Sequence, residues 1–277
     1  MARTSIESFG ALGGSDRPSG DVSMTTFAWQ RIELAQALRC AVRALAIGVA
    51  LAPMLLLHLV WRALKLPSAW PRLFLKVVAR VLGIRVNATG SPLRRDVFYV
   101  ANHVSWTDVA IFGGLTGTAF VAQHGVASWP VIGTLARLNR TIFVNRAGKQ
   151  QVVEQIAQLR AAIAENWTVT LFPEGTTSDG LGLLPFKQAL FATMVPPPRA
   201  MMIQPVWLEF GAIGPEVAWI GEETGWHSAW RTFARAGSYP VTVHFLEPFD
   251  PSGCADRKQI SATARARIVA AMAAKPG

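Results

Sequence analysis

A histidine and an aspartate stand at a spacing that suits acid–base chemistry. His103 and Asp108 lie in the stretch ANHVSWTD, where an apolar strand is predicted to end and a helix to begin. A histidine can take a proton from an attacking hydroxyl near neutral pH, and a carboxylate one helical turn away can hold its ring and stabilise the imidazolium. The pair predicts general base catalysis at the carboxyl end of a strand, where open α/β sheets bind ligands.

The same stretch also fits a structural role. Ser105 to Asp108 has the form of a capping box, with Ser105 at the helix N-cap and Asp108 reaching back. Taken alone, the spacing of His103 and Asp108 is weak evidence of catalysis. No metal site is expected, because the other histidines show no ligand spacing with His103; they are His58, His124, His227 and His244.

Two further segments place polar groups after predicted strands. The strand TIFVNR would deliver Arg146 to the same sheet edge, where a guanidinium can bind phosphate or carboxylate with two hydrogen bonds. The segment LFPEGTTSDG, residues 171–180, would form a loop whose glycines let the backbone approach a ligand. The chain has no Walker loop and no G-x-S-x-G elbow, so nucleotide-triphosphate and serine-hydrolase interpretations lose their main support.

The elements that must position these groups follow an α/β pattern beyond residue 85. Short apolar strands alternate with helical stretches. Strands are predicted at residues 97–101, 119–122, 141–145, 168–172, 202–208 and 241–246, and helices at 105–115, 129–138, 149–166, 186–193 and 256–273.

The N-terminal part has a different composition. Residues 1–26 are predicted to be a disordered tail, and residues 27–84 to form membrane-anchoring helices. The apolar run from Ala44 to Trp61 just reaches spanning length. The next segment carries Arg72, Lys76 and Arg80 on one helical face, which suits either an anionic headgroup layer or the solvated face of an ordinary domain helix. Both flanks are basic, so a helical pair embedded in one leaflet is as plausible as a span.

Composition indicates an apolar and anionic environment. The 277 residues are 51% hydrophobic, with a net charge of +10 and a mean hydropathy of +0.29. Basic residues flank apolar stretches and do not alternate with exposed aromatics, which favours a membrane surface over nucleic acid. Cys40 and Cys254 are far apart in the sequence and are predicted to be free thiols.

Taken jointly, these segments resemble the glycerolipid acyltransferase family, which comprises the lysophosphatidic acid acyltransferases and their relatives. The N-H-x4-D, strand-Arg, F-P-E-G and apolar proline-containing blocks match residues 102–108, 143–146, 172–175 and 203–206. With LLPFK at 183–187, the resemblance covers roughly residues 85–250. It implies a mixed, largely parallel sheet flanked by helices, a glycerol-3-phosphate acyltransferase-like domain over residues 85–277, behind the membrane-binding helical segment.

The resemblance also implies a reaction. A fatty acyl group would pass from an acyl carrier protein or coenzyme A thioester to a lysolipid hydroxyl, with no acyl-enzyme, metal or cofactor. His103 would be the general base and Asp108 its orienting partner. The residues expected to bind substrate are Asn102, Arg146, Glu174, Gly175 and Thr176. Backbone amides near Gly175 would bind the tetrahedral oxyanion. The expected location is a membrane, on the cytoplasmic face of a bacterial inner membrane.

The expected acceptor is 1-acyl-sn-glycerol-3-phosphate, which would give phosphatidic acid, but two departures from the family pattern leave another acceptor open. Thr177 stands where many members have Arg, and Gln123 stands where relatives often have Lys. Both departures remove positive charge from the place expected for a phosphate. The T-T-S-D-G variant resembles the lyso-ornithine lipid subgroup. An alternative of another class is a non-catalytic membrane lipid-binding protein, in which His103 only caps structure.

Overall fold

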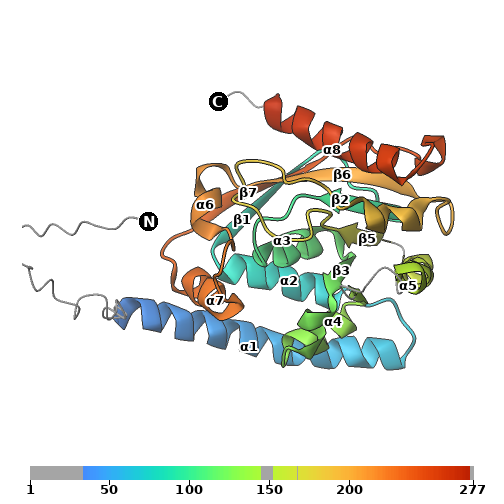
Figure 1. Cartoon of the computed structure of the whole chain (residues 1–277). Helices are drawn as coiled ribbons and strands as arrows, with labels where there is room; N and C mark the ends of the chain where they lie inside the picture. Colours follow the sequence, from blue (N-terminus) through green and yellow to red (C-terminus); the bar gives the residue numbers. More distant parts are fainter. Residues whose placement is uncertain (1–33, 145–151, 167, 275–277) are drawn as a thin grey trace, which may run out of the picture.

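A largely parallel sheet forms the centre of the protein. The structure is a computed structural model, and it describes residues 34–144, 152–166 and 168–274 (Figure 1). The strands in those residues are β1 (Ile84–Thr89), β2 (Val97–Ala101), β3 (Ala119–Gln123), β4 (Ile142–Val144), β5 (Thr168–Leu171), β6 (Met202–Glu209) and β7 (Tyr239–Phe245). Their order across the sheet is β1-β7-β6-β2-β5-β3-β4. β6 and β7 pair antiparallel and the other neighbours pair parallel, which confirms the predicted mixed, largely parallel sheet.

Helices cover both faces of this sheet. The helices are α1 (Leu34–Ala63), α2 (Trp70–Val81), α3 (Thr107–Thr116), α4 (Ile132–Leu138), α5 (Val152–Glu165), α6 (Gly214–Val217), α7 (Gly225–Ala234) and α8 (Arg257–Ala273), with short turns η2 (His124–Ser128), η4 (Gln188–Met194), η5 (Gly211–Ile213) and η6 (Pro251–Gly253). One core cluster joins the sheet to α2 and α3, and a second joins it to α5, η4 and α8. In Figure 1, α8 and α2 accordingly lie on opposite sides of the strands.

One predicted element needs correction, and two observed elements were missed. The helix expected at residues 186–193 is the 3-10 helix η4, and β1 and α7 were not predicted from the sequence. β1 is an edge strand in which Ile84 is buried and most other side chains are exposed, so it lacks the apolar run that marked the central strands. The strands predicted at 97–101, 119–122, 141–145, 168–172, 202–208 and 241–246 correspond to β2 to β7 with ends shifted by two residues at most.

A pair of glycines lets α2 lie very close to α3. A methyl group placed on Gly114 would sit 2.9 Å from the backbone nitrogen of Lys76 and 3.0 Å from its Cα. One on Gly113 would sit 2.5 Å from a side-chain carbon of Leu75. Because α3 begins just before Asp108, this close contact ties the predicted anchor segment directly to the element that carries a predicted site residue.

Helix α1 is both apolar and docked. Within the described residues it is long and apolar enough to cross a membrane by length and composition. It exposes a row of large side chains along its length, namely Leu34, Leu38, Val42, Leu45, Val49, Leu56, Leu59 and Val60. On its other side, Arg39 donates to the Ala234 carbonyl at 2.8 Å, and Arg43 donates to those of Phe233 and Arg235 at 2.9 and 2.8 Å. These arginines cap the carboxyl end of α7, so α1 is fixed along the domain as Figure 1 shows.

The two tyrosines of the chain give a direct test of the core. Tyr99 and Tyr239 are 0% and 3% exposed, and burial raises the pKa of both hydroxyls, that of Tyr239 to about 12. The unfolded chain ionises tyrosine near pH 10, whereas the folded protein keeps the tyrosines protonated to higher pH. The stability that the protonated tyrosines contribute is therefore complete below about pH 10 and is lost as pH rises above it. We expect tyrosinate absorbance to stay flat through about pH 10 and to rise only together with loss of the helical circular dichroism signal. Tyrosinate formed near pH 10 in the folded protein would contradict the buried placement.

Candidate active site

The predicted histidine–aspartate pair is formed. His103 Nδ1 lies 2.8 Å from Asp108 Oδ2, and the two side chains are 20% and 0% exposed. Local backbone geometry brings them together, because β2 ends at Ala101 and α3 begins at Thr107, with the tight connection between them. Since a carboxylate accepts hydrogen bonds, the pair places the proton on Nδ1 and leaves the Nε2 lone pair available.

Asp108 also helps to start helix α3, as the capping-box interpretation predicted, but the cap differs in form from the predicted one. The residue at the N-cap of α3 is Trp106, not Ser105, and it makes no side-chain cap. Asp108 Oδ2 accepts the backbone N–H groups of Val104 at 2.7 Å and Ser105 at 3.1 Å, besides the His103 ring. One carboxylate oxygen therefore both shapes the turn and orients the imidazole, so the two readings are compatible.

The imidazole lies in an aromatic stack with one nitrogen open. Its ring stacks on Phe172 at a centroid distance of 4.2 Å and an angle of 14°, and Phe172 in turn stacks on Phe120 at 6.0 Å. No side chain in the described parts of the chain forms a hydrogen bond with His103 Nε2. The stack fixes the ring plane while Nε2 remains available to a ligand, which is the geometry that a general base needs.

The loop after β5 holds the backbone of His103 from both sides. Glu174 Oε1 accepts the His103 N–H at 2.8 Å, and the His103 carbonyl accepts the Ser178 N–H at 2.8 Å and its hydroxyl at 3.2 Å. Glu174 Oε2 accepts the Leu184 N–H at 2.9 Å, so both carboxylate oxygens are engaged. Nothing in the sequence indicated a role for Ser178, because its partner, the His103 carbonyl, lies 75 positions earlier in the chain.

Glu174 is 2% exposed, and its burial raises the pKa of its carboxyl, while the N–H groups of His103 and Leu184 oppose the rise. The folded state therefore keeps a proton at pH values where the unfolded chain has lost it. This contribution to the free energy of unfolding is present below the ordinary glutamate pKa of about 4.3 and is lost as pH rises through the raised value.

Glu174→Gln tests this arrangement. An amide can accept only one of the two N–H groups, so a buried donor loses its partner, and we expect activity to fall about ten- to hundredfold. The variant also lacks the titrating group, so from about pH 4 to 7 wild type should lose unfolding free energy relative to the variant. Initial rates and urea denaturation at both pH values measure the two effects, with the exposed Glu222→Gln as control. Parallel pH dependences of wild type and Glu174→Gln would refute the assignment.

The other predicted substrate ligands are placed differently. Asn102 is buried, and its side-chain amide pairs with both backbone groups of Leu208, which joins β2 to β6. The Gly175 N–H, near the expected oxyanion donors, donates to the Phe172 carbonyl at 3.2 Å, and Thr176 is exposed beside it. Arg146 lies outside the described residues. Substrate binding by these residues stays a prediction, and the amide of Gly175 is already engaged.

A second histidine–carboxylate pair occurs on β7 and β6. His244 Nε2 lies 2.7 Å from Glu209 Oε2, while its Nδ1 lies 2.9 Å from the Thr89 hydroxyl. Its ring stacks on Trp207 at 4.6 Å. Both ring nitrogens of His244 are thus occupied, whereas His103 Nε2 has no partner among the described residues, and this distinguishes the candidate base from a structural histidine.

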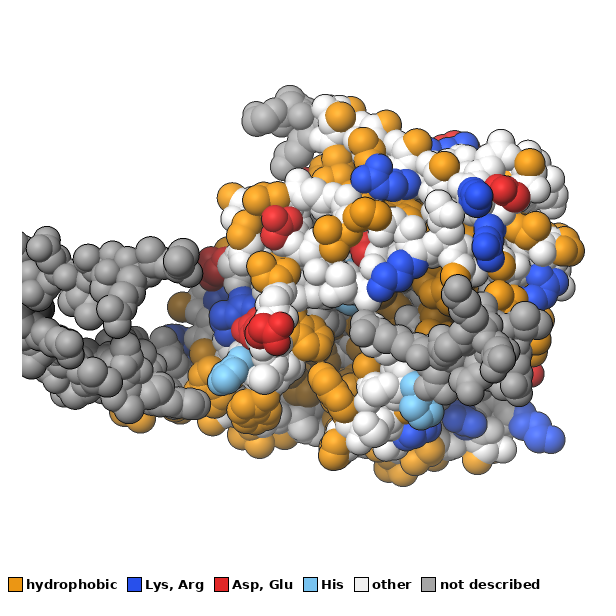
Figure 2. Space-filling model, in the orientation of Figure 1, with side chains coloured by type: hydrophobic (Ala, Val, Ile, Leu, Met, Phe, Trp, Pro, Cys, Tyr) orange, Lys and Arg blue, Asp and Glu red, His pale blue; other side chains and the backbone are white. Residues whose placement is uncertain are grey.

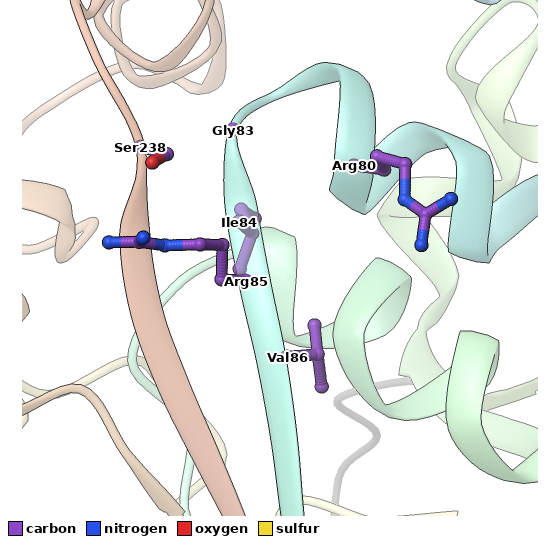
Figure 3. Close-up of a pocket in the computed structure, with 6 residues that line it drawn as sticks. All are labelled: Arg80, Gly83, Ile84, Arg85, Val86 and Ser238. Carbon is purple, nitrogen blue, oxygen red and sulfur yellow. The ribbon is translucent and has the colours of Figure 1, made fainter.

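Two cavities lie away from the His103–Asp108 pair. One of about 320 Å³ is lined by Arg80, Gly83, Ile84, Arg85, Val86 and Ser238 at the edge of the sheet, and Figure 3 shows the Arg80 and Arg85 side chains diverging from each other. The other, of about 290 Å³, lies near Asp96 and Met202, at the opposite end of β2 from His103. Among the described residues, no group of three or more histidine, cysteine, aspartate or glutamate side chains could hold a metal ion.

Apolar side chains border the candidate site. The backbone N–H of Trp219 donates to the carbonyl of Val104, the residue after His103, and the Trp219 ring lies 6.5 Å from that of Trp129. Trp129, Val131 and Trp226 are exposed at 43%, 61% and 75%. Figure 2 shows hydrophobic side chains along the lower border of this face, where Figure 1 places α1, α4 and α7. An apolar surface thus extends toward the His103–Asp108 pair.

Comparison with known proteins gives consistent matches. The family model described as Acyltransferase matches residues 84–209. A lyso-ornithine lipid O-acyltransferase of Rhizobium meliloti is 35% identical over 256 residues, which cover 87% of this chain and 85% of that protein. A 1-acyl-sn-glycerol-3-phosphate acyltransferase of Neisseria gonorrhoeae is 33% identical over 41% of this chain and 45% of that protein. The crystal structure of the acyltransferase PlsC from Thermotoga maritima has a similar fold, with a TM-score of 0.60 and 21% identity over 87% of this chain and 99% of that one.

Proposed function

We propose that this chain, which belongs to the acyltransferase family, transfers a fatty acyl group from a thioester carrier to the free hydroxyl of a lysolipid. The observation that carries the proposal is His103, whose Nδ1 is held by a buried carboxylate while its Nε2 is left open by the part of the chain that the structure describes. A base of this kind serves an acceptor that must lose a hydroxyl proton.

The reaction follows from that geometry. Nε2 of His103 takes the hydroxyl proton as the acceptor oxygen bonds to the thioester carbonyl carbon. The carbon–sulfur bond of the resulting tetrahedral intermediate then breaks, and the imidazolium returns the proton to the departing thiolate. The products are an ester and a free thiol. Asp108 stabilises the imidazolium between these two steps.

We propose a lyso-ornithine lipid as the acceptor, with 1-acyl-sn-glycerol-3-phosphate as the second candidate. Two relatives with the first name are 33–35% identical over 85–90% of their length, whereas proteins with the second name match either over less than half of their length, as in Neisseria, or at 29% identity over 69% of it, as in Limnanthes douglasii. The residues that replace family cations support the same choice. Thr177 donates its hydroxyl to the Trp219 carbonyl, and Gln123 Nε2 donates to the Gly175 carbonyl at 3.3 Å, so both positions hold neutral groups.

The proposed donor is acyl carrier protein or acyl-coenzyme A, and the proposed location is the cytoplasmic face of a bacterial inner membrane, where such carriers occur. The exposed apolar row of α1 supports membrane association. A net charge of +10 favours encounter with an acidic carrier protein, and this advantage should weaken with salt.

An acceptor and donor panel tests the proposal. Purified full-length protein in mixed micelles is given lyso-ornithine lipid, lysophosphatidic acid or monoacylglycerol, each with acyl carrier protein and coenzyme A thioesters, and the diacyl product is quantified. We expect the highest kcat/KM with lyso-ornithine lipid. A preference for lysophosphatidic acid would overturn only the proposed head group and would leave the acyltransferase proposal in place. Absence of turnover with every pair, together with lipid binding, would favour the non-catalytic lipid-binding alternative.

A further inference from the structure

Lys187 lies against the loop that holds the catalytic histidine. Its N–H donates to the Pro173 carbonyl at 2.8 Å, which fixes its backbone beside that loop. Its side chain then runs flat across Gly175: a methyl group placed on this glycine would sit 2.5 Å from Lys187 Nζ, 2.8 Å from Cδ and 2.9 Å from Cε. Gly175 has a φ of +67°, so its backbone conformation favours glycine, and the absence of a side chain leaves the space that the Lys187 side chain occupies.

The ammonium group therefore stands at the carboxyl edge of the parallel strands. In the sheet order, β5 lies between β2, which leads to His103, and β3, which ends at Gln123. Glu174, the neighbour of Gly175, binds the His103 N–H, and Gln123 binds the Gly175 carbonyl. Lys187 thus lies over the strand end between the catalytic base and Gln123, at the sheet edge where α/β proteins bind ligands.

Its charge has no partner within the described residues. Lys187 is exposed and takes part in none of the ion pairs found there. The nearby carboxylate of Glu174 is buried, with both oxygens bound to N–H groups. The Gln123 amide and the exposed Thr176 hydroxyl add neutral donors beside it. A cation with neutral donors and no carboxylate partner is suited to an anionic ligand.

We propose that Lys187 binds the anionic group of the acceptor head group while the free hydroxyl of the same acceptor lies at His103 Nε2. This rests on the proposed function and adds a specificity residue to it. For a lyso-ornithine lipid the anion is the ornithine carboxylate, and for lysophosphatidic acid it is the phosphate. Lys187 then selects charged acceptors in a site where Thr177 and Gln123 carry no charge.

The test compares charged and neutralised acceptors in wild type and Lys187→Met, which keeps an unbranched side chain and removes the charge. We expect Lys187→Met to raise the KM for lyso-ornithine lipid at least tenfold, with a smaller change in kcat, because a hydrogen bond to a charged group is lost. With the carboxyl methyl ester, wild type and variant should have similar kcat/KM. Lys187→Arg should recover part of the preference for the acid, and Lys258→Met, an exposed lysine at the start of α8, should behave as wild type.

Equal losses with the acid and its ester would overturn the proposal, because the lysine would then only position the loop. So would a rise confined to the KM of the thioester donor, which would assign Lys187 to the donor. If wild type instead prefers lysophosphatidic acid, the proposed head group fails, and Lys187 is judged by the same comparison between lysophosphatidic acid and monoacylglycerol. In that case a loss of selectivity against the neutral acceptor upholds the role of Lys187, and unchanged selectivity refutes it.

Discussion

We expect His103→Ala to lower kcat for acyl transfer by about a thousandfold, within the range of about 10²–10⁴ for loss of a general acid–base group. The substitution removes the imidazole that receives the acceptor proton. It keeps the backbone N–H and carbonyl through which Glu174 and Ser178 hold this turn. The fold and lysolipid binding should therefore persist. Product formation under saturating substrates, with equilibrium binding of a labelled lysolipid, separates the two effects.

A matched control is available in the second histidine–carboxylate pair. His244 contacts Glu209 at 2.7 Å, as closely as His103 contacts Asp108, but both of its ring nitrogens are occupied. His244→Ala should lower the free energy of unfolding while kcat stays near the wild-type value. If His103→Ala kept more than about a tenth of wild-type turnover, the proton acceptor would have to be another group.

Asp108→Asn should lower kcat by up to about 10⁴, the loss that the same substitution of the orienting aspartate causes in a serine protease triad. The asparagine oxygen can still accept the three N–H groups that Oδ2 accepts, so the turn should form. The variant lacks the negative charge that stabilises the imidazolium, however. It also places an NH2 group at the buried position of Oδ1, which has no partner among the described residues.

Asp96→Asn is the control for this second prediction. Asp96 lies just before β2, at the opposite end of the strand from His103, and pairs with Arg199 at 2.8 Å. Its φ of +52° is one that asparagine accepts readily. We expect a small loss of stability and unchanged kcat there. Comparable losses of kcat in both variants would show that removal of a carboxylate near either end of β2 disturbs the sheet, and would count against a specific role for Asp108.

The strand that the sequence predicted with both ends correct is buried on both faces. β2 is buried at every position, and a continuous apolar run such as VFYVA is typical of a central parallel strand. β1 was missed for the opposite reason, since only Ile84 is buried and its pairing with β7 is made by backbone groups. α7 was missed because its place depends on Arg39 and Arg43, which bind its carboxyl end from 190 or more positions away.

The sequence by itself determined the local chemistry of this protein. The distance from His103 to Asp108 is short enough along the chain that one tight turn brings the side chains together, whatever the rest of the fold does. Strand order and register decided which distant residues contact the His103 backbone and ring. Only because β5 pairs beside β2 does Glu174 meet the backbone of His103. Only the packed structure shows that Nε2 of His244 is occupied, whereas no residue in the described ranges contacts Nε2 of His103. Contacts between residues about 70 positions apart depend on which strands become neighbours, and no spacing along the chain encodes that choice.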